Sequence, residues 1–144
     1  PPWEEPSFEI TGVEARRDRL LVPIQLDGIS RMAVLDTGAQ ATTIGMAMAR
    51  RLGLTGPLLA NDRAIMAHGA SPRAVAVHLH RFEELTVGPA HIRSPILAVA
   101  PQDNAMGDAL LGGDFLHGRR VWLSFPTRRL FVSMKGTSRL ATAR

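Results

Sequence analysis

Short stretches in which apolar and polar residues alternate run through most of the chain, and turn signals separate them. Alternation with a period of two residues is typical of β-strands that bury one face. The pattern predicts strands over the following ranges: 7–15, 20–26, 29–35, 60–67, 73–87, 92–99, 121–125 and 130–133. The sequence therefore predicts an all-β domain built from many short strands.

Turn signals and two helix-like segments interrupt these strands. Asp27-Gly28 is a dipeptide that favours the two-residue turn of a β-hairpin. Residues 45–52 have apolar spacing typical of a helix with one buried face, and Gly53 follows as a C-terminal cap. Residues 112–117 are predicted to form a second short helix. The fold is thus expected to contain one or two short helices beside its strands.

Length and composition are those of one globular domain. The chain has 144 residues, 45% of them hydrophobic, and no cysteine. The lack of cysteine excludes a disulfide framework, a cysteine-type zinc site and a thiol nucleophile. We expect an N-terminal arm over residues 1–19, a main domain over 20–134 and a basic, flexible tail over 135–144.

The net charge of +4 does not by itself indicate a nucleic-acid partner. Arginines occur in pairs, but aromatic residues make up only 5% of the chain and tyrosine is absent. We therefore expect no nucleic-acid partner, although a basic adaptor for nucleic acid or an acidic membrane is an alternative that predicts salt-sensitive binding. No run of 18 apolar residues predicts a membrane span, and residues 1–10 lack the pattern of a signal peptide.

An aspartate stands directly after the predicted strand 29–35. Asp36 is followed by Thr37, Gly38 and Ala39. An acid that activates water must be accessible to water and rigidly held, and the end of a buried strand meets both needs. The hydroxyl of Thr37 and the amide of Gly38 can hydrogen-bond around the loop, and Gly38 has no Cβ to keep the substrate backbone away. This pattern identifies Asp36 as the candidate catalytic residue, with Thr37 and Gly38 in support.

Two segments together resemble the retropepsin family, the aspartic proteases of retroviral type. Residues 35–39, Leu-Asp-Thr-Gly-Ala, resemble the family's active-site motif, and residues 110–112, Leu-Leu-Gly, resemble its apolar-apolar-Gly strand. The turn-rich segment 68–71 lies where that family has the tip of its flap hairpin. The sequence of residues 110–132 resembles bacterial members more than viral ones, and the resemblance to the family covers about residues 20–132.

The resemblance implies a closed, bent β-barrel of the acid protease type, with a flap hairpin. It also implies an aspartic endopeptidase that cleaves extended polypeptides without a metal or an organic cofactor. Because the chain has a single Asp-Thr-Gly, the pair of aspartates would come from a homodimer in which each subunit supplies Asp36. By the same resemblance, substrate is expected to contact Gly38, Ala39, Gln40, His68, Gly69 and Ala70.

The sequence departs from the viral pattern at three places. Gln40 and Ala41 stand where viral members commonly have an acidic residue, and Gly113 replaces their arginine. Residues 121–133 add a hairpin after the second motif, so the dimer sheet is expected to be built differently. Similarity to bacterial members suggests the periplasm or cell envelope as the compartment. A catalytically silent dimerisation or peptide-binding module is the alternative, and an untrimmed precursor is a variant of the main interpretation.

Other polar residues have structural interpretations. Asp114 is expected to interact with the amides of the first turn of its helix, and Asp108 to hydrogen-bond within its own loop. His78 and His80 share one face of a predicted strand, and His91 follows on the next. These histidines are an alternative metal site, but exposed strand histidines are the expectation, so no metal is predicted.

Overall fold

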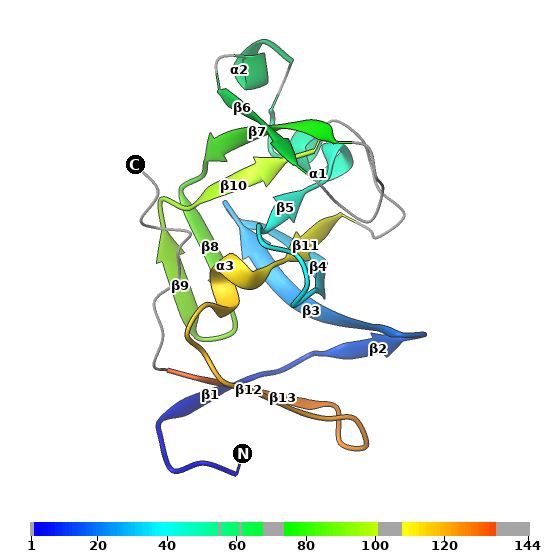
Figure 1. Ribbon diagram of the computed structural model, residues 1–144, viewed down its shortest axis with the longest axis vertical. Coiled ribbons are helices and arrows are strands. Elements are labelled where there is room, and N and C mark those ends of the chain that lie inside the picture. The colour runs from blue at the N-terminus through cyan, green and yellow to red at the C-terminus, as the bar shows by residue number, and fades with distance from the viewer. Residues whose placement is uncertain (1, 55, 61, 68–73, 101–107, 135–144) are drawn as a thin grey trace.

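The computed structural model describes residues 2–54, 56–60, 62–67, 74–100 and 108–134. Most of its strands join one long, curled sheet, and a smaller sheet lies at one end (Figure 1). The strands are β1 Ser7–Ile10, β2 Glu14–Arg16, β3 Arg19–Leu26, β4 Ile29–Leu35, β5 Thr43–Ile44, β6 Arg63–Ala67, β7 Val75–Arg81, β8 Glu84–Val87, β9 Ala90–Arg93, β10 Ile96–Val99, β11 Ala109–Leu111, β12 Val121–Ser124 and β13 Arg129–Ser133. The helices are α1 Met46–Arg51, α2 Gly56–Ala60 and α3 Gly113–Leu116.

The order of the strands places the two sequence motifs side by side. The large sheet has the order β6-β7-β10-β5-β11-β4-β3-β8-β9, with β2 also paired to β3. Strand β11 lies between β4 and β5, antiparallel to β5 and parallel to β4, with Leu111 opposite Leu35. Parallel strands end at the same edge of a sheet, so the residues that follow β4 and β11 meet there.

The core is built from alternating strand residues of the curled sheet. Val22, Ile24 and Leu26 of β3 are at most 3% exposed, as the period-two pattern predicts. Phe115 of α3 is fully buried among them and joins the helix to the same core. Burial of each such side chain contributes about 1.5–3 kcal/mol, so the strands on either side of the motifs are firmly anchored.

The expected all-β fold is confirmed, as are several local elements. Asp27 and Gly28 form the turn between β3 and β4 with φ values of 47° and 83°. Helix α1 occupies the middle of the predicted segment 45–52, and Gly53 adopts φ 76° after it. The hairpin β6–β7 is present, but its predicted tip lies in residues 68–73, outside the described part of the chain, as does the predicted tail 135–144.

Three predicted strands are wrong in extent, because each is two strands in the structure. The range 7–15 divides into β1 and β2, since Gly12 between them has φ 73°. The range 73–87 divides into β7 and β8, and the range 92–99 divides into β9 and β10. Both breaks lie beside each other, where Phe82 N–H donates to Pro95 O and Ser94 N–H donates to Glu83 O. Alternation alone does not reveal such corners, because the buried face continues through them.

The predicted strand 60–67 is also wrong at its start, because helix α2 runs to Ala60 and β6 begins at Arg63. The described residues thus contain three short helices instead of one or two. None of these helices is long and apolar enough to cross a membrane.

A bidentate ion pair ties β1 to β13 in the small sheet. Arg129 Nε donates to Glu9 Oε1 at 2.9 Å, and its Nη2 donates to Oε2 at 3.1 Å. The hydrogen bonds from Arg129 lower the pKa of Glu9. A carboxyl group with a lowered folded-state pKa stabilises the fold above its unfolded pKa, and this contribution is lost as the pH falls through the folded-state pKa.

We therefore expect the melting temperature of the wild type to fall more between neutral pH and about pH 3 than that of Glu9→Gln. Differential scanning calorimetry of both proteins over this range measures the difference, which is small because the pair is exposed. Parallel pH curves for the two proteins would contradict a stabilising role for the pair.

Candidate active site

Asp36 leaves the sheet at the end of β4 and is held there by backbone and side-chain hydrogen bonds. Its N–H donates to Leu111 O at 3.0 Å, and Ala39 N–H donates to its carbonyl oxygen at 3.3 Å. Gly38 N–H donates to Oδ1 of the carboxylate at 2.9 Å. The side chain is only partly buried, and Thr37 and Gly38 are exposed. The carboxylate is therefore fixed in orientation yet open to water.

Gly38 is suited to this loop by its lack of a side chain. A Cβ at this position would stand 3.3 Å from Oδ1 of Asp36, tighter than most such contacts. A larger residue here would press on the carboxylate that the Gly38 amide orients. The predicted support from Gly38 thus corresponds to a specific contact, whereas Thr37 makes no side-chain hydrogen bond among the described residues.

The loop from Asp36 to Thr42 crosses the end of β11 and is bound to the residues that follow that strand. Gly113 N–H donates to Ala39 O at 2.7 Å, and Asp114 N–H donates to Gln40 O at 3.0 Å. A Cβ on Gly112 would lie 2.7 Å from the carbonyl carbon of Ala41, closer than real Cβ atoms come to backbone. The close passage of the two segments therefore requires glycine at position 112.

Thr42 and Asp114 also link the two segments, through side-chain hydrogen bonds. The Asp114 carboxylate accepts hydrogen bonds from Thr42 N–H at 2.8 Å, from Thr42 Oγ1 at 2.7 Å and from Phe115 N–H at 2.8 Å. Thr42 Oγ1 in turn accepts from Gly112 N–H at 3.0 Å, and Thr42 is fully buried. We name this set of contacts among Thr42, Gly112 and Asp114 the loop clasp.

The loop clasp was only partly predictable. The expected contact of Asp114 with an amide of its own helix exists, at Phe115 N–H. Its contact with Thr42 joins residues 72 positions apart, and no local pattern in one sequence indicates such a pairing. The carboxylate of Asp108 pairs with Arg31 on β4 at 3.3 Å. The preceding loop, in which Asp108 was expected to form hydrogen bonds, lies outside the described residues.

A pocket of about 330 Å³ lies beside the loop. It is lined by residues of the motif loop and of α3, namely Thr37, Gly38, Ala39, Gln40, Gly113, Asp114 and His117. The structure thus gathers Gly38, Ala39 and Gln40, which the sequence predicts as substrate contacts, around one cavity next to Asp36. The other predicted contacts, His68, Gly69 and Ala70, fall outside the described residues.

Two of the three histidines considered as a metal site have carboxylate partners, whereas Nδ1 of His78 is buried without a hydrogen-bond partner among the described residues. His80 Nδ1 lies 2.6 Å from Asp62 Oδ2, and the ring packs edge-on against Phe82. His91 Nδ1 lies 3.2 Å from Glu84 Oε1, and this hydrogen bond lowers the pKa of Glu84. Over the described ranges, no three His, Cys, Asp or Glu side chains come together in a way that would hold a metal ion.

Comparisons with known proteins agree with this geometry. A family model described as aspartyl protease matches residues 22–115, which include both motif segments. The chain therefore belongs to the aspartyl protease family, and its fold is that of the retropepsin-like members. No curated protein matches the sequence.

Two solved structures have the same fold. A retropepsin-like aspartic protease from Rickettsia conorii superposes with a TM-score of 0.65 at 15% identity, over 90% of this chain and 93% of that one. The retroviral protease-like domain of Ddi1 from Leishmania major superposes with a TM-score of 0.57 at 18% identity, over 84% of this chain and 93% of that one. At these identities the likeness concerns the fold.

Proposed function

We propose that the chain is an aspartic endopeptidase that hydrolyses extended polypeptides as a homodimer. The observation that carries the proposal is the state of Asp36, which is oriented by Gly38 N–H at the end of a buried strand and remains accessible to water. Membership of the aspartyl protease family supports the reaction type. In the dimer, Asp36 of each subunit stands beside the same residue of the other.

The chemistry needs two carboxylates that share one proton. Two carboxylates close together do not both ionise easily, so one stays protonated while the other is ionised. The ionised group takes a proton from water as the water oxygen attacks the carbonyl carbon, and the protonated group donates its proton to the carbonyl oxygen. Proton transfer to the amide nitrogen then accompanies cleavage of the C–N bond, and no covalent intermediate forms.

A homodimer follows from the count of active-site motifs. The 144-residue chain contains one Asp-Thr-Gly, so a single copy supplies half of the pair. A two-fold axis brings the same residue of two copies together. The two carboxyl groups then titrate as a pair, and the pH dependence of cleavage reports apparent pKa values of the dimer.

The β6–β7 hairpin is proposed to close over the substrate. Two apolar side chains near its end, Met66 and Val75, are 60% and 40% exposed. Exposed apolar side chains on a hairpin are suited to cover an apolar substrate and exclude water during the reaction. His68, Gly69 and Ala70 would contact the substrate from the tip. We therefore expect cleavage between apolar residues of an extended peptide.

Digestion of a diverse peptide library by the wild type tests the proposal. Mass spectrometry at several values between about pH 3 and about pH 8 identifies the cleaved bonds and the active pH range. Repeating the digestion at decreasing protein concentrations, with sedimentation velocity on the same samples, relates rate to dimer content. We expect the rate per subunit to fall in step with the fraction of dimer.

Two outcomes would contradict the proposal. Full activity in samples that contain only monomer would exclude a catalytic pair formed across a dimer. A stable dimer that cleaves no peptide at any pH would instead support a catalytically silent dimerisation or peptide-binding module.

A further inference from the structure

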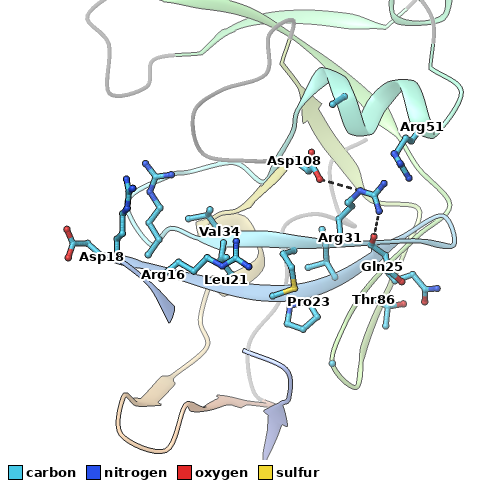
Figure 2. Close-up of a pocket in the computed structure, with 17 residues that line it drawn as sticks. Arg16, Asp18, Leu21, Pro23, Gln25, Arg31, Val34, Arg51, Thr86 and Asp108 are labelled. Carbon is cyan, nitrogen blue, oxygen red and sulfur yellow. Dashed lines mark hydrogen bonds and ion pairs between the residues drawn. The ribbon is translucent and has the colours of Figure 1, made fainter. Parts of the chain in front are cut away.

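A groove in the described part of the chain runs along the β3–β4 hairpin, and most of the strand residues that line it lie on the face away from the core. Its volume is about 1470 Å³. Figure 2 shows residues that line it. Most of the floor consists of strand residues that alternate with the core residues, with Leu21 opposite Val34 and Pro23 opposite Met32. The core residue Ile24 also contributes to the lining. A strand pair that is apolar on both faces usually has a cover on each face. Here the outer face forms an open groove with an apolar floor.

Arginines from three separate elements line this apolar floor. They are Arg16, Arg17 and Arg19 around the β2–β3 turn, Arg31 on β4 and Arg51 on α1. Figure 2 shows Arg16 toward one end of the groove and Arg51 toward the other. Among the described residues the acidic lining residues are Asp18 and Asp108, so five arginines against two aspartates leave a net charge of +3.

Part of this charge is compensated within the chain. Arg31 Nε lies 3.3 Å from Asp108 Oδ2, and Arg16 lies 3.3 Å from Glu14 on its own strand. Arg17 and Arg51 have no carboxylate partner among the described residues. Arg17 occupies the exposed β2–β3 turn with φ 53°. The groove therefore presents guanidinium groups at both ends of an apolar floor.

We propose that this groove binds an acidic, apolar segment of the polypeptide substrate, at a distance from the bond that is cut. The proposal rests on the protease function proposed above. Guanidinium groups bind carboxylates with paired hydrogen bonds, and the floor between them accepts apolar side chains. Strand β4 runs from the groove to the active site, since Val34 in the groove precedes Asp36 by two residues, about 7 Å along a strand.

The lining of the groove favours a polypeptide over a nucleic acid. Single-stranded nucleic acids bind through aromatic side chains on which the bases stack, and no aromatic residue is among the described residues that line this groove. An extended peptide places successive side chains on opposite sides, so that acidic and apolar residues in alternation reach the arginines and the floor. Bound in this way, one part of a substrate would raise the local concentration of another part at the active site.

Binding of a fluorescein-labelled decapeptide of alternating glutamate and valine tests the proposal, with fluorescence anisotropy at about 50 mM salt. Arg17→Glu and Arg51→Glu are each expected to weaken binding about fivefold or more, because reversal replaces an attraction with a repulsion. Arg50→Glu is the matched control for Arg51, since Arg50 is its exposed neighbour on α1 but does not line the groove. Arg128→Glu is the control for Arg17, because both are exposed turn arginines with φ 53°. Both controls should bind as the wild type does.

Binding is measured separately from cleavage, so the two proposals fail separately. Asp36→Asn should bind the decapeptide as tightly as the wild type. If the wild type binds the decapeptide but cleaves no peptide, the protease function alone is contradicted. The groove proposal is wrong if the decapeptide does not bind, if a lysine–valine decapeptide binds equally well, or if the controls weaken binding as much as the groove variants. It is also wrong if only labelled oligothymidylate or phosphatidylserine vesicles bind in a manner that Arg17→Glu and Arg51→Glu abolish.

Discussion

Asp36→Asn is expected to abolish peptide cleavage while leaving the fold and the dimer intact. An amide at this position still accepts a hydrogen bond from Gly38 N–H, so the loop keeps its geometry. It does not take a proton from water, and it does not share one with a second carboxyl group. General acid–base catalysis by one group typically contributes about 10²–10⁴-fold, and here both groups of the pair are lost. We therefore expect a decrease in kcat of at least about 10³-fold, measured on the peptides that the wild type cleaves.

Glu83→Gln is the control for this substitution, because Glu83 is an exposed carboxylate between β7 and β8 that lines neither the pocket beside Asp36 nor the arginine-lined groove. It should retain wild-type activity. Mixing subunits provides a second measurement, since an equal mixture of wild type and Asp36→Asn contains about one quarter wild-type dimers after exchange. The activity per wild-type subunit should then fall to about half. Retained cleavage by Asp36→Asn, or no loss on mixing, would contradict a shared catalytic pair.

The features that were predictable from the sequence are those that neighbouring residues determine. Asp27-Gly28 forms its turn because the two residues tolerate positive φ, and Gly53 ends α1 for the same reason. The position of Asp36 after β4 follows equally from a short apolar run and a break. The Gly38 contact with Asp36 joins residues two positions apart, so neighbouring residues in the sequence were sufficient to predict it.

The features that were not predictable depend on residues distant in sequence. Phe82 lies at the break between β7 and β8, and Pro95 lies at the break between β9 and β10. The two breaks are adjacent, and Phe82 N–H donates to Pro95 O across them. The loop clasp joins Thr42 to Asp114, and the arginine groove joins the β2–β3 turn to α1. Such contacts can be predicted only when the strand order is known. The insertion of β11 between β4 and β5, which makes the loop clasp possible, has no local signature.

The loop clasp leads to the second large expected effect, at Thr42. Thr42→Val keeps the shape of this fully buried side chain but removes its hydroxyl. Gly112 N–H, itself in a buried residue, then loses its acceptor, and Asp114 Oδ1 loses a donor at 2.7 Å. An unsatisfied buried polar group costs about 1–3 kcal/mol, so we expect destabilisation by about 2–4 kcal/mol. For a chain of this size that corresponds to a decrease in melting temperature of about 6–12 °C, measured by calorimetry at equal protein concentration.

Thr42→Ser is the matched control, because it distinguishes the effect of losing the hydroxyl from the effect of losing the methyl group. It retains both hydrogen bonds of the hydroxyl and loses only a buried methyl group, so its destabilisation should be about 1 kcal/mol. The loop between Asp36 and Thr42 is anchored by β4 at one end and by the loop clasp at the other. Below its melting temperature, Thr42→Val should therefore also decrease kcat, because a loosened loop holds the carboxylate less rigidly, whereas Thr42→Ser should not. Equal stability of the two variants would show that the hydroxyl contributes nothing, and that the Asp114 contact with Thr42 N–H is sufficient to hold the loop.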